Sequence, residues 1–567
     1  MLRLTDIRLP LPLPLPDGPA HAEAELRHAA AQRLGLAVAD LASVRVVRRS
    51  LDARKKNAAV FLYSLDVSVA DEARVLARCA QGSGVALAEE QAYRFPVEAP
   101  SSSSLSSSSS SLSSSFGGRP VVVGAGPCGL FAALALAQAG FAPLVLERGQ
   151  AIEDRAASVD AFWRGGPLGP ESNVQFGEGG AGAFSDGKLT TQIKERRGRC
   201  RKVLTELVAH GAPEDILWQH KPHVGTDLLR GVVLGLRTSI LALGGEVRFN
   251  ARVDGLVLRQ GRVAGVRLCD GVEIPATAVI LAVGHSARDT FAMLFAGGVR
   301  LEQKQFAMGC RVEHLQGDID RAQLRDLAGH PALGPADYKL AHACQDGGAA
   351  SGRSVYSFCM CPGGSVIAAA SEEGGVVTNG MSLHARAATN GNSALLVNVG
   401  PNDLGSGNPL AGVDFQRRWE RLAFELGGRD YTAPAQSVGD FLAGRASQGF
   451  GLVHPSYEPG VRPADLTRCL PDFVAAALRE ALPAFDRKLR GFADAQAVLT
   501  GVETRSSSPV RILRGADMQS VGLPGLFPAG EGAGYAGGIV SSAVDGLRVA
   551  EAAALSLCGL PVGDLES

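Results

Sequence analysis

The stretch VVVGAGPCG, residues 121–129, largely determines the fold expected for this chain of 567 residues. Its three valines predict a short buried strand, which runs directly into the glycine pattern GxGxxG and then into an alanine-rich helix. Gly124 permits a tight turn, Gly126 lets a pyrophosphate approach the backbone, and Gly129 lets the helix pack closely on the strand. Strand, glycines and helix together favour a dinucleotide-binding βαβ unit over an ordinary glycine-rich turn.

Two further features of this region concern phosphate and ribose. Pro127 and Cys128 lie in the turn just before the predicted helix, Leu130 to Ala139, whose unpaired N–H groups and dipole favour a phosphate at its amino end. We expect Cys128 to serve packing rather than chemistry. Glu147 ends the second strand about twenty residues after the turn, where a carboxylate accepts hydrogen bonds from the adenosine ribose.

The distal part of the chain decides between FAD and NAD. Residues 525–532, GLFPAGEG, predict an apolar strand ending in Ala-Gly-Glu, and residues 534–538, GYAGG, lead into an apolar helix. Glu531 at this strand end suits a ribityl hydroxyl. The helix that begins near Gly538 and Ile539 can direct its amino end at the pyrimidine ring of a flavin.

These residues resemble the second FAD motif of the glutathione-reductase-like flavoproteins. The first motif, Glu147-Arg148 and Ala282-Val283-Gly284-His285 match the FAD half of that family in the same order. The residues expected to bind FAD are Gly124, Gly126, Pro127, Cys128, Gly129, Glu147, Arg148, Gly182, Ser185, Gly187, Gly284, Gly530, Glu531, Gly538 and Ile539.

Three other motifs extend the resemblance: GEGGAGAFSDGKL at residues 177–189, YSFCMCPGG at 356–364 and ETRSSSP at 503–509. Together they resemble a family of uncharacterised FAD-dependent dehydrogenases of bacteria and plastids, whose members carry an extra amino-terminal domain. The resemblance implies an FAD-dependent oxidoreductase, and it runs from about residue 44 to residue 553. The serine run at residues 101–115 is a departure, since a shorter connection is expected in that family.

The serine run marks the clearest domain boundary, because it is too poor in apolar side chains to offset the entropy of ordering. The expected fold class is α/β: a Rossmann-type FAD-binding domain with an inserted α+β substrate or cap domain and a small N-terminal α+β domain. The expected units are residues 1–97 (N-terminal domain), 98–117 (linker), 118–305 and 500–567 (the two parts of the FAD-binding domain) and 306–499 (the insert).

Three residues are candidates for catalysis. Small residues around Lys188 would let backbone N–H groups reach flavin N5 and O4, and Lys188 would stabilise the negative charge of reduced flavin near N1; the alternative is a surface loop with a solvated lysine. His285 follows a strand end as a proton donor or as a hydrogen-bonded structural histidine. Arg505 either clamps a substrate carboxylate or pairs with Glu503 or another acid.

The cysteines indicate a reducing compartment and no metal. Ten are scattered along the chain without any CxxC pair, so we predict a cytoplasmic protein without a structural metal. Cys359 and Cys361 alternate on a predicted strand and would face one side, as a redox pair, as a site near the flavin or, in the commoner case, as buried packing residues.

Composition and charge limit the classes of partner that we expect. A formal net charge of -1 provides no global field for nucleic acid, and no uninterrupted apolar run predicts a membrane span. The basic cluster of the first domain favours a solvated turn over a surface for RNA, a nucleotide or an acidic partner, because no aromatic ladder accompanies it. That cluster consists of Arg45, Arg48, Arg49, Arg54, Lys55 and Lys56.

The predicted function is hydride transfer between flavin N5 and an unidentified small molecule. A flavin-bearing binding or sensor protein, whose basic N-terminal domain recognises a partner or RNA, is the alternative. Residues 306–499 lack a second dinucleotide fingerprint, so electrons would come from the substrate or from a separate donor or acceptor, and NAD(P)H would be a poor reductant. Arg311, Arg353 and Arg386 are the alternative anchors for a nicotinamide nucleotide.

Overall fold

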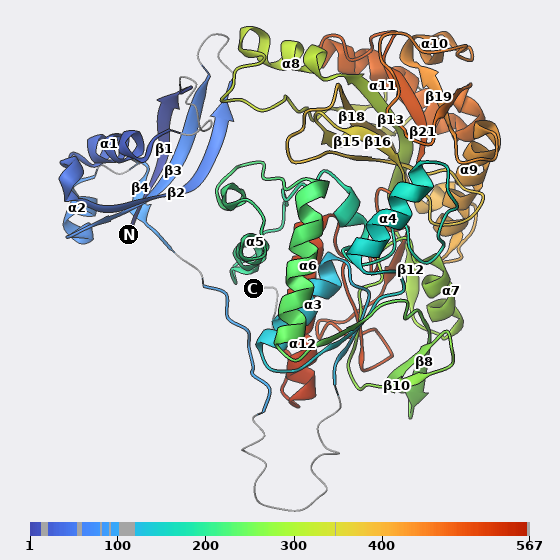
Figure 1. Ribbon diagram of the computed structural model, residues 1–567, viewed down its shortest axis with the longest axis horizontal. Coiled ribbons are helices and arrows are strands. Elements are labelled where there is room, and N and C mark those ends of the chain that lie inside the picture. Colours follow the sequence, from blue (N-terminus) through green and yellow to red (C-terminus); the bar gives the residue numbers. More distant parts are fainter. Residues whose placement is uncertain are drawn as a thin grey trace, which may run out of the picture.

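The computed structural model describes residues 1–12, 21–53, 59–79, 82–89, 92–100, 119–345 and 347–563. Figure 1 shows a small N-terminal sheet set to one side of the rest of the molecule. The predicted linker lies almost wholly outside the described residues, and so do Arg54, Lys55 and Lys56 of the basic cluster. No helix in the described part of the chain is both long and apolar enough to cross a membrane.

A five-stranded parallel sheet forms the nucleotide-binding part, with strand order β23-β11-β5-β6-β7. The alanine-rich helix α3 is buried along most of its length because it packs against both α6 and α12. Bounds are β5 Val121–Val123, α3 Pro127–Gln138, β6 Leu144–Leu146, α4 Ile152–Trp163, α5 Arg199–Ala209, α6 Thr226–Ala242, β7 Glu246–Arg248, β11 Val279–Leu281, β23 Leu526–Pro528 and α12 Ile539–Leu557.

Smaller sheets flank this core. Three antiparallel strands in the order β10-β9-β8 precede β11, and the pairs β12–β22 and β16–β17 are antiparallel as well. Bounds are β8 Val253–Arg259, β9 Arg262–Leu268, β10 Glu273–Pro275, α7 Arg288–Ala296, β12 Leu301–Gln303, β16 Ser365–Ala368, β17 Thr378–Met381 and β22 Val510–Ile512.

A seven-stranded sheet forms the remaining large layer, with strand order β14-β15-β18-β13-β21-β19-β20. Figure 1 places it above the parallel sheet, with α9, α10 and α11 around it. Bounds are β13 Phe306–Leu315, α8 Gln316–Leu324, β14 Ala341–Ala343, β15 Ser354–Cys361, β18 Asn390–Val399, α9 Ala411–Gly427, β19 Ala433–Ser437, α10 Val438–Ala443, β20 Val461–Pro463, α11 Asp472–Lys488 and β21 Val498–Glu503.

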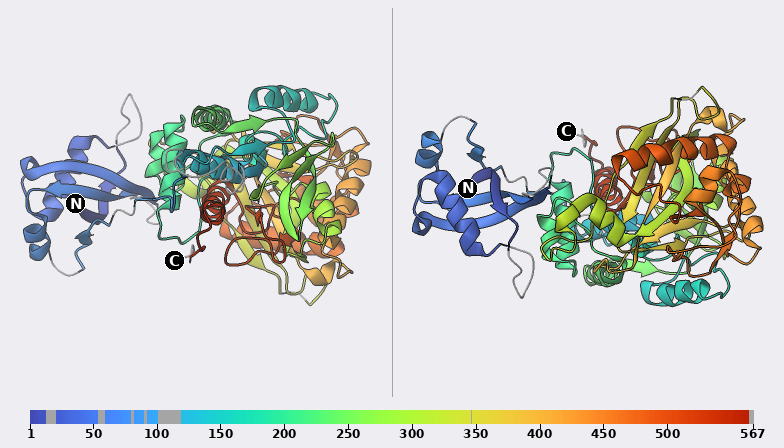
Figure 2. Two further views of the ribbon diagram at one scale, coloured as in Figure 1. Left: turned by 90° about the horizontal axis from the view of Figure 1, so that it is seen from below. Right: turned by 90° about the horizontal axis from the view of Figure 1, so that it is seen from above.

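The N-terminal domain is a four-stranded antiparallel sheet, in the order β2-β3-β1-β4, with two helices. Alternate residues of β3 are buried in its core, as the period of two in the sequence predicts. Figure 2 shows in both views that this domain projects from one end of the molecule. Bounds are β1 Leu2–Pro10, α1 Glu23–Leu34, β2 Leu41–Asp52, β3 Val60–Val69, α2 Glu72–Arg78 and β4 Val85–Leu87.

The predicted fold class, α/β with a Rossmann-type core, is confirmed. The strand β7 joins the edge of the parallel sheet. The seven-stranded sheet extends past residue 499, the expected end of the insert, because β21 continues to Glu503.

Candidate flavin site

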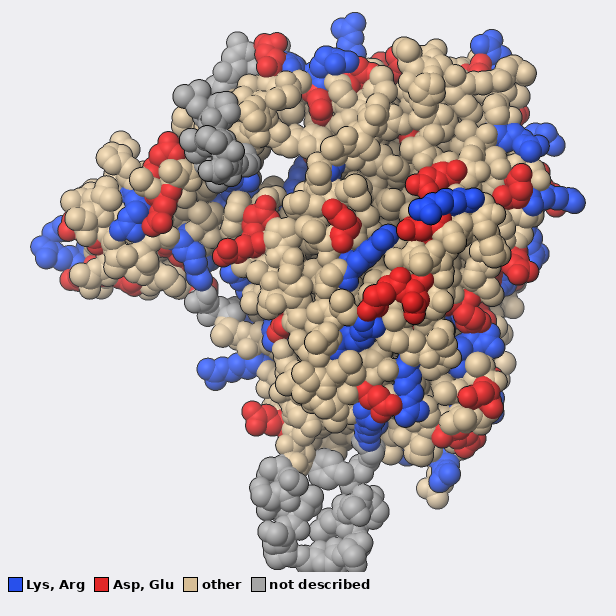
Figure 3. Space-filling model, viewed as in Figure 1, with Lys and Arg blue, Asp and Glu red and all other residues tan. Residues whose placement is uncertain are grey.

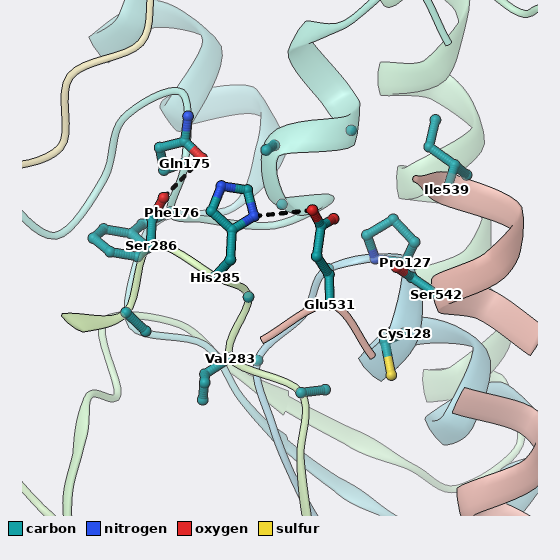
Figure 4. Close-up of a pocket in the computed structure, with 18 of the residues that line it drawn as sticks. Pro127, Cys128, Gln175, Phe176, Val283, His285, Ser286, Glu531, Ile539 and Ser542 are labelled. Atoms are coloured by element: carbon teal, nitrogen blue, oxygen red, sulfur yellow. Dashed lines mark hydrogen bonds and ion pairs between the residues drawn. The ribbon is translucent and has the colours of Figure 1, made fainter. Parts of the chain in front are cut away.

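One cavity lies where the parallel sheet meets the seven-stranded sheet. It has about 1580 Å³ of atom-free space, a figure that includes its open mouth. Its wall contains the turn after β5, the ends of β11 and β23, the start of α12 and residues of the large sheet such as Phe358 and Glu503. Figure 4 shows Pro127, Glu531 and Ile539 around it.

The glycine turn has the geometry that the sequence predicts. Gly124 has a φ of 102°, which only glycine adopts freely. A Cβ at Gly126 would meet only Cα of Gly180, 3.8 Å away, so this position has room for a ligand. A Cβ at Gly129 would lie 1.9 Å from the carbonyl oxygen of Gly124, which explains why the helix can pack here only on glycine.

Glu147 is fixed at the cavity wall by backbone N–H groups. One carboxylate oxygen accepts hydrogen bonds from Gly149 (2.9 Å) and Gly177 (3.0 Å), and the other accepts one from Ala125 (2.8 Å). The second oxygen keeps a lone pair, because a carboxylate oxygen accepts two hydrogen bonds. Glu147 is therefore oriented before any ribose binds.

The second predicted acid, Glu531, lies on the same cavity. Its Oε1 is 3.2 Å from Nδ1 of His285, as Figure 4 shows. Nε2 of His285 is buried and has no hydrogen-bond partner among the residues that the structure describes. The amino end of α12 is close by, since Gly538 and Ile539 also line the cavity.

The glycine-rich loop is held in place by a buried arginine. Arg155 is fully buried and donates to the carbonyl oxygens of Asn173 (2.9 Å), Val174 (3.0 Å) and Gly177 (3.2 Å), and also to that of Glu178. Burial lowers the pKa of Arg155 to about 9. Arg155 is thus a structural cation that shapes the loop opposite the phosphate turn.

Lys188 belongs to a three-residue charge cluster at the cavity. Its Nζ lies 4.0 Å from Oδ2 of Asp186, and Asp186 accepts hydrogen bonds from Arg386 and Ser382. Burial alone would raise the pKa of Asp186, but the charges of Arg386 and Lys188 outweigh it and lower the pKa. Because Arg386 already neutralises Asp186, the cluster leaves one positive charge beside the cavity.

Arg505 lines the cavity but is committed to a carboxylate. Its Nε and Nη2 lie 3.1 Å and 2.9 Å from the two oxygens of Glu420, and its Nη1 contacts Ser371. The predicted alternative of an ion pair therefore describes it better than a substrate clamp. The partner is Glu420, because Glu503 pairs with Arg311 at 2.6 Å.

The two cysteines of the YSFCMCPGG motif do not face one side as predicted. A bulge between Phe358 and Cys361 interrupts the pairing of β15 with β18, and Cys359 has a φ of 47°. Cys359 consequently lines the cavity, whereas Cys361 is buried behind it and donates to the carbonyl oxygen of Cys359. Both are free thiols, and burial raises the pKa of Cys361 to about 12.

Most of the predicted binding residues meet at this cavity. Gly129 and Gly530 do not line it: Gly129 packs the helix on the turn, and Gly530 donates its N–H to Asp545 at 2.7 Å. The predicted residues that do line it are Gly124, Gly126, Pro127, Cys128, Glu147, Arg148, Gly182, Ser185, Gly187, Lys188, Gly284, His285, Arg505, Glu531, Gly538 and Ile539.

Arg148 lines the cavity and packs its guanidinium on the aromatic ring of Phe176. Its guanidinium lies 4.1 Å from the ring centroid of Phe176 and pairs with Asp289 at 2.9 Å and Glu171 at 2.8 Å. Sequence reasoning missed Phe176 and also the hydrogen bond of 3.1 Å from Ser286 to Gln175 on the same wall. Phe176 directly precedes the motif at residues 177–189, and Ser286 directly follows His285. Their positions beside these motifs could have identified them as wall residues.

Other polar groups lie apart from the cavity. His342, Cys344 and Glu480 bring donor atoms within 4.8 Å of one another, with Nε2 of His342 2.9 Å from Oε1 of Glu480. The sequence-based expectation that the protein holds no structural metal stays a prediction.

Comparison with known proteins places the chain in a family. A protein of Clostridium beijerinckii described as uncharacterised is 47% identical over 520 residues, which cover 92% of this chain and 94% of that protein. Residues 305–506 match the family model "FAD-dependent protein, C-terminal domain-like". This chain belongs to that FAD-dependent family. Residues 1–68 of this chain match a second family model, which describes a domain of unknown function.

Solved structures share limited similarity with this FAD-dependent protein. A triple mutant of the flavin-dependent brominase Bmp2 is 11% identical with a TM-score of 0.35, and the match covers 78% of this chain and 81% of the brominase. A geranylgeranyl bacteriochlorophyll reductase-like protein of Thermoplasma acidophilum is 14% identical with a TM-score of 0.34, over 78% and 79% of the two chains.

The residues at the cavity fit FAD, the cofactor of the family. Two helix amino ends, at Pro127 and Ile539, border it and suit a pyrophosphate and a flavin ring. Glu147 and Glu531 provide the acceptors for two polyol groups. The unpaired Nε2 of His285 is a donor or acceptor that a bound polar ligand can satisfy.

Proposed function

We propose that the protein is an FAD-dependent oxidoreductase that transfers a hydride between flavin N5 and an unidentified small molecule. The observation that supports this most is the continuity of one cavity. The phosphate turn at Gly126, the lysine at position 188 and the wall of the large sheet at Phe358 all border the same space. A substrate in it would lie beside the cofactor rather than in a separate site.

FAD, when bound, supplies the hydride acceptor or donor. The chain supplies the surroundings. Arg386 and Asp186 neutralise each other, so the positive charge of Lys188 remains beside the cavity. This charge suits the anionic form of reduced flavin near N1. Cys359 and Ser506 also line the cavity, where a thiol and a hydroxyl are available to a substrate.

The other two candidates from the sequence have supporting roles in this proposal. His285 orients Glu531, and Arg505 holds the sheet wall through Glu420. Neither is assigned proton transfer or substrate binding. Lys188 is the residue that we expect to act on the reacting centre.

The test uses FAD-loaded protein that has been photoreduced without oxygen. It is mixed with quinones, unsaturated acids and cyclic polyenes, and the return of the oxidised flavin absorbance is followed. We expect at least one class to reoxidise the flavin faster than buffer does, and Lys188→Met to slow that reaction. Lys194→Met is the matched control, because Lys194 is exposed on the same segment.

Failure of every acceptor would favour the alternative function. The protein would then be a flavin-bearing binding or sensor protein whose N-terminal domain recognises a partner. An equal effect of Lys188→Met and Lys194→Met would remove Lys188 from the proposed chemistry.

A further inference from the structure

The basic cluster of the N-terminal domain contacts the body of the protein. The guanidinium of Arg49 lies between two aromatic rings, 4.9 Å from the centroid of Phe61 in its own domain and 4.6 Å from that of Trp218. Nη2 of Arg48 is 2.8 Å from Nδ1 of His220. Figure 3 shows basic and acidic side chains interspersed on the visible face of the molecule.

Backbone hydrogen bonds reinforce this contact. The N–H of Arg49 donates to the carbonyl oxygen of Trp218 (2.7 Å), and the N–H of His220 donates to the carbonyl oxygen of Arg49 (2.9 Å). Arg49 and Gln219 therefore form a parallel β-bridge at the edge strand β2. Such a bridge fixes the register of residues 218–220 relative to the N-terminal sheet.

The same short segment then pairs with the loop that carries Lys188. His223 and Lys188 form an antiparallel β-bridge, flanked by hydrogen bonds from Leu189 to Pro222 (3.0 Å) and from Val224 to Gly187 (3.1 Å). Gly187 and Lys188 line the cavity. Only residue 221 separates the contact of the segment with the N-terminal domain from its contact with the flavin loop.

Close packing makes this segment suited to transmit position. A Cβ at Gly187 would lie 2.8 Å from the backbone nitrogen of Gly225, so loop and segment are in direct contact. The ring of His223 also stacks on that of His384, with centroids 5.2 Å apart. Movement of residues 218–220 would therefore displace the loop rather than be absorbed between them.

We propose that the N-terminal domain positions the Lys188 loop of the flavin site, with Arg49 and Trp218 as the positioning residues and residues 218–225 as the connection. The role of Lys188 in this proposal rests on the proposed function, whereas the mechanical connection does not. In this proposal the N-terminal domain acts on the flavin site indirectly, since none of its described residues lines the cavity.

The test compares hydrogen exchange and the flavin reduction potential in the full-length protein loaded with FAD. The variants are Arg49→Ala, Trp218→Ala, Trp218→Phe and Lys188→Met, and Arg74→Ala is the control on the exposed face of α2. Arg49→Ala and Trp218→Ala should raise exchange at the amides of Leu189 and Val224 about tenfold. Trp218→Phe should restore slow exchange, because it keeps a ring for Arg49.

The flavin reduction potential distinguishes a change in the position of Lys188 from a general loss of stability. Loss of a positive charge disfavours reduced flavin, so Lys188→Met should lower the potential, and Arg49→Ala should lower it in the same direction. Unchanged exchange in Arg49→Ala and Trp218→Ala would overturn the connection. Faster exchange with a lowered potential only in Lys188→Met would overturn the positioning role. Faster exchange without any effect of Lys188→Met on the potential would support the connection and contradict the proposed role of Lys188.

Discussion

Nδ1 of His285 lies 3.2 Å from Oε1 of Glu531, and the contact joins the ends of two neighbouring parallel strands. His285 follows β11, and Glu531 follows β23. Ligands of open parallel sheets bind at the carboxyl ends of strands, so this pair stands where a dinucleotide passes. The imidazole therefore orients the carboxylate that we expect to bind the ribityl chain.

Substitution of both partners should reveal this coupling. We expect His285→Ala and Glu531→Gln each to weaken FAD binding to the apoprotein. The loss of binding free energy in the double variant should be smaller than the sum of the two single losses. The interaction energy should be about 1 kcal/mol or more, as for contacting residues. Flavin fluorescence titration of the four proteins measures it, and additive losses would show that the two side chains act independently.

Glu178 should make stability depend on pH. Burial raises its pKa to about 7, and one carboxylate oxygen has no partner among the described residues. Because this pKa exceeds that of the unfolded chain, the contribution of Glu178 to stability is present below about pH 4.5 and is lost as the pH rises through 7. Glu178→Gln should therefore raise Tm at pH 8 and change it little at pH 4.5. The same gain at both pH values would contradict a titrating Glu178.

Glu420 should be needed for stability rather than for substrate affinity. Burial alone would raise its pKa, but Arg288 and Arg505 outweigh burial and hold the pKa well below its ordinary value. Glu420→Gln would leave the buried guanidinium of Arg505 without its carboxylate partner and Arg288 with Glu372 alone, at a cost of about 3–5 kcal/mol in denaturant unfolding. Glu425→Gln, on the exposed face of the same helix, should cost little. A raised KM with unchanged stability would instead restore Arg505 as a substrate clamp.

NADH and NADPH should reduce the bound flavin slowly. No second dinucleotide turn occurs among the described residues of the insert, and the three arginines that could replace it are paired with acids. Arg311 binds Glu503, Arg353 binds Asp403 and Arg386 binds Asp186. Stopped-flow mixing should give slow bleaching that does not saturate with nucleotide. Fast bleaching that saturates at low nucleotide concentration would reveal a nicotinamide site.

Much of the flavin site could be predicted from the sequence because the residues that form each motif are neighbours in the chain. Gly124, Gly126 and Gly129 specify the turn within six residues. Glu147 directly follows β6, and Glu531 comes shortly after β23. The structure adds the backbone donors that fix Glu147, which follow once the strand and the glycine loop are placed.

The remaining features depend on residues distant in the chain. Asp186 pairs with Arg386 across 200 residues, and Glu420 pairs with Arg505 across 85. Several acids and arginines could have formed these pairs, so composition and spacing could not select among them. The bulge at Cys359 likewise results from pairing with β18, and the contact of Arg49 with a distant segment cannot be read from the basic cluster itself.

The flavin content of the purified protein tests the central claim most directly, and Gly126→Val with Gly231→Val provides the matched comparison. A valine at Gly126 would project toward the cavity, whereas Gly231 has no atoms within 4 Å of an added Cβ. We predict that the wild type and Gly231→Val are yellow, with one FAD per chain that denaturation releases intact, and that Gly126→Val is folded and colourless. A colourless wild-type protein that takes up no FAD in a spectrophotometric titration would contradict the assignment.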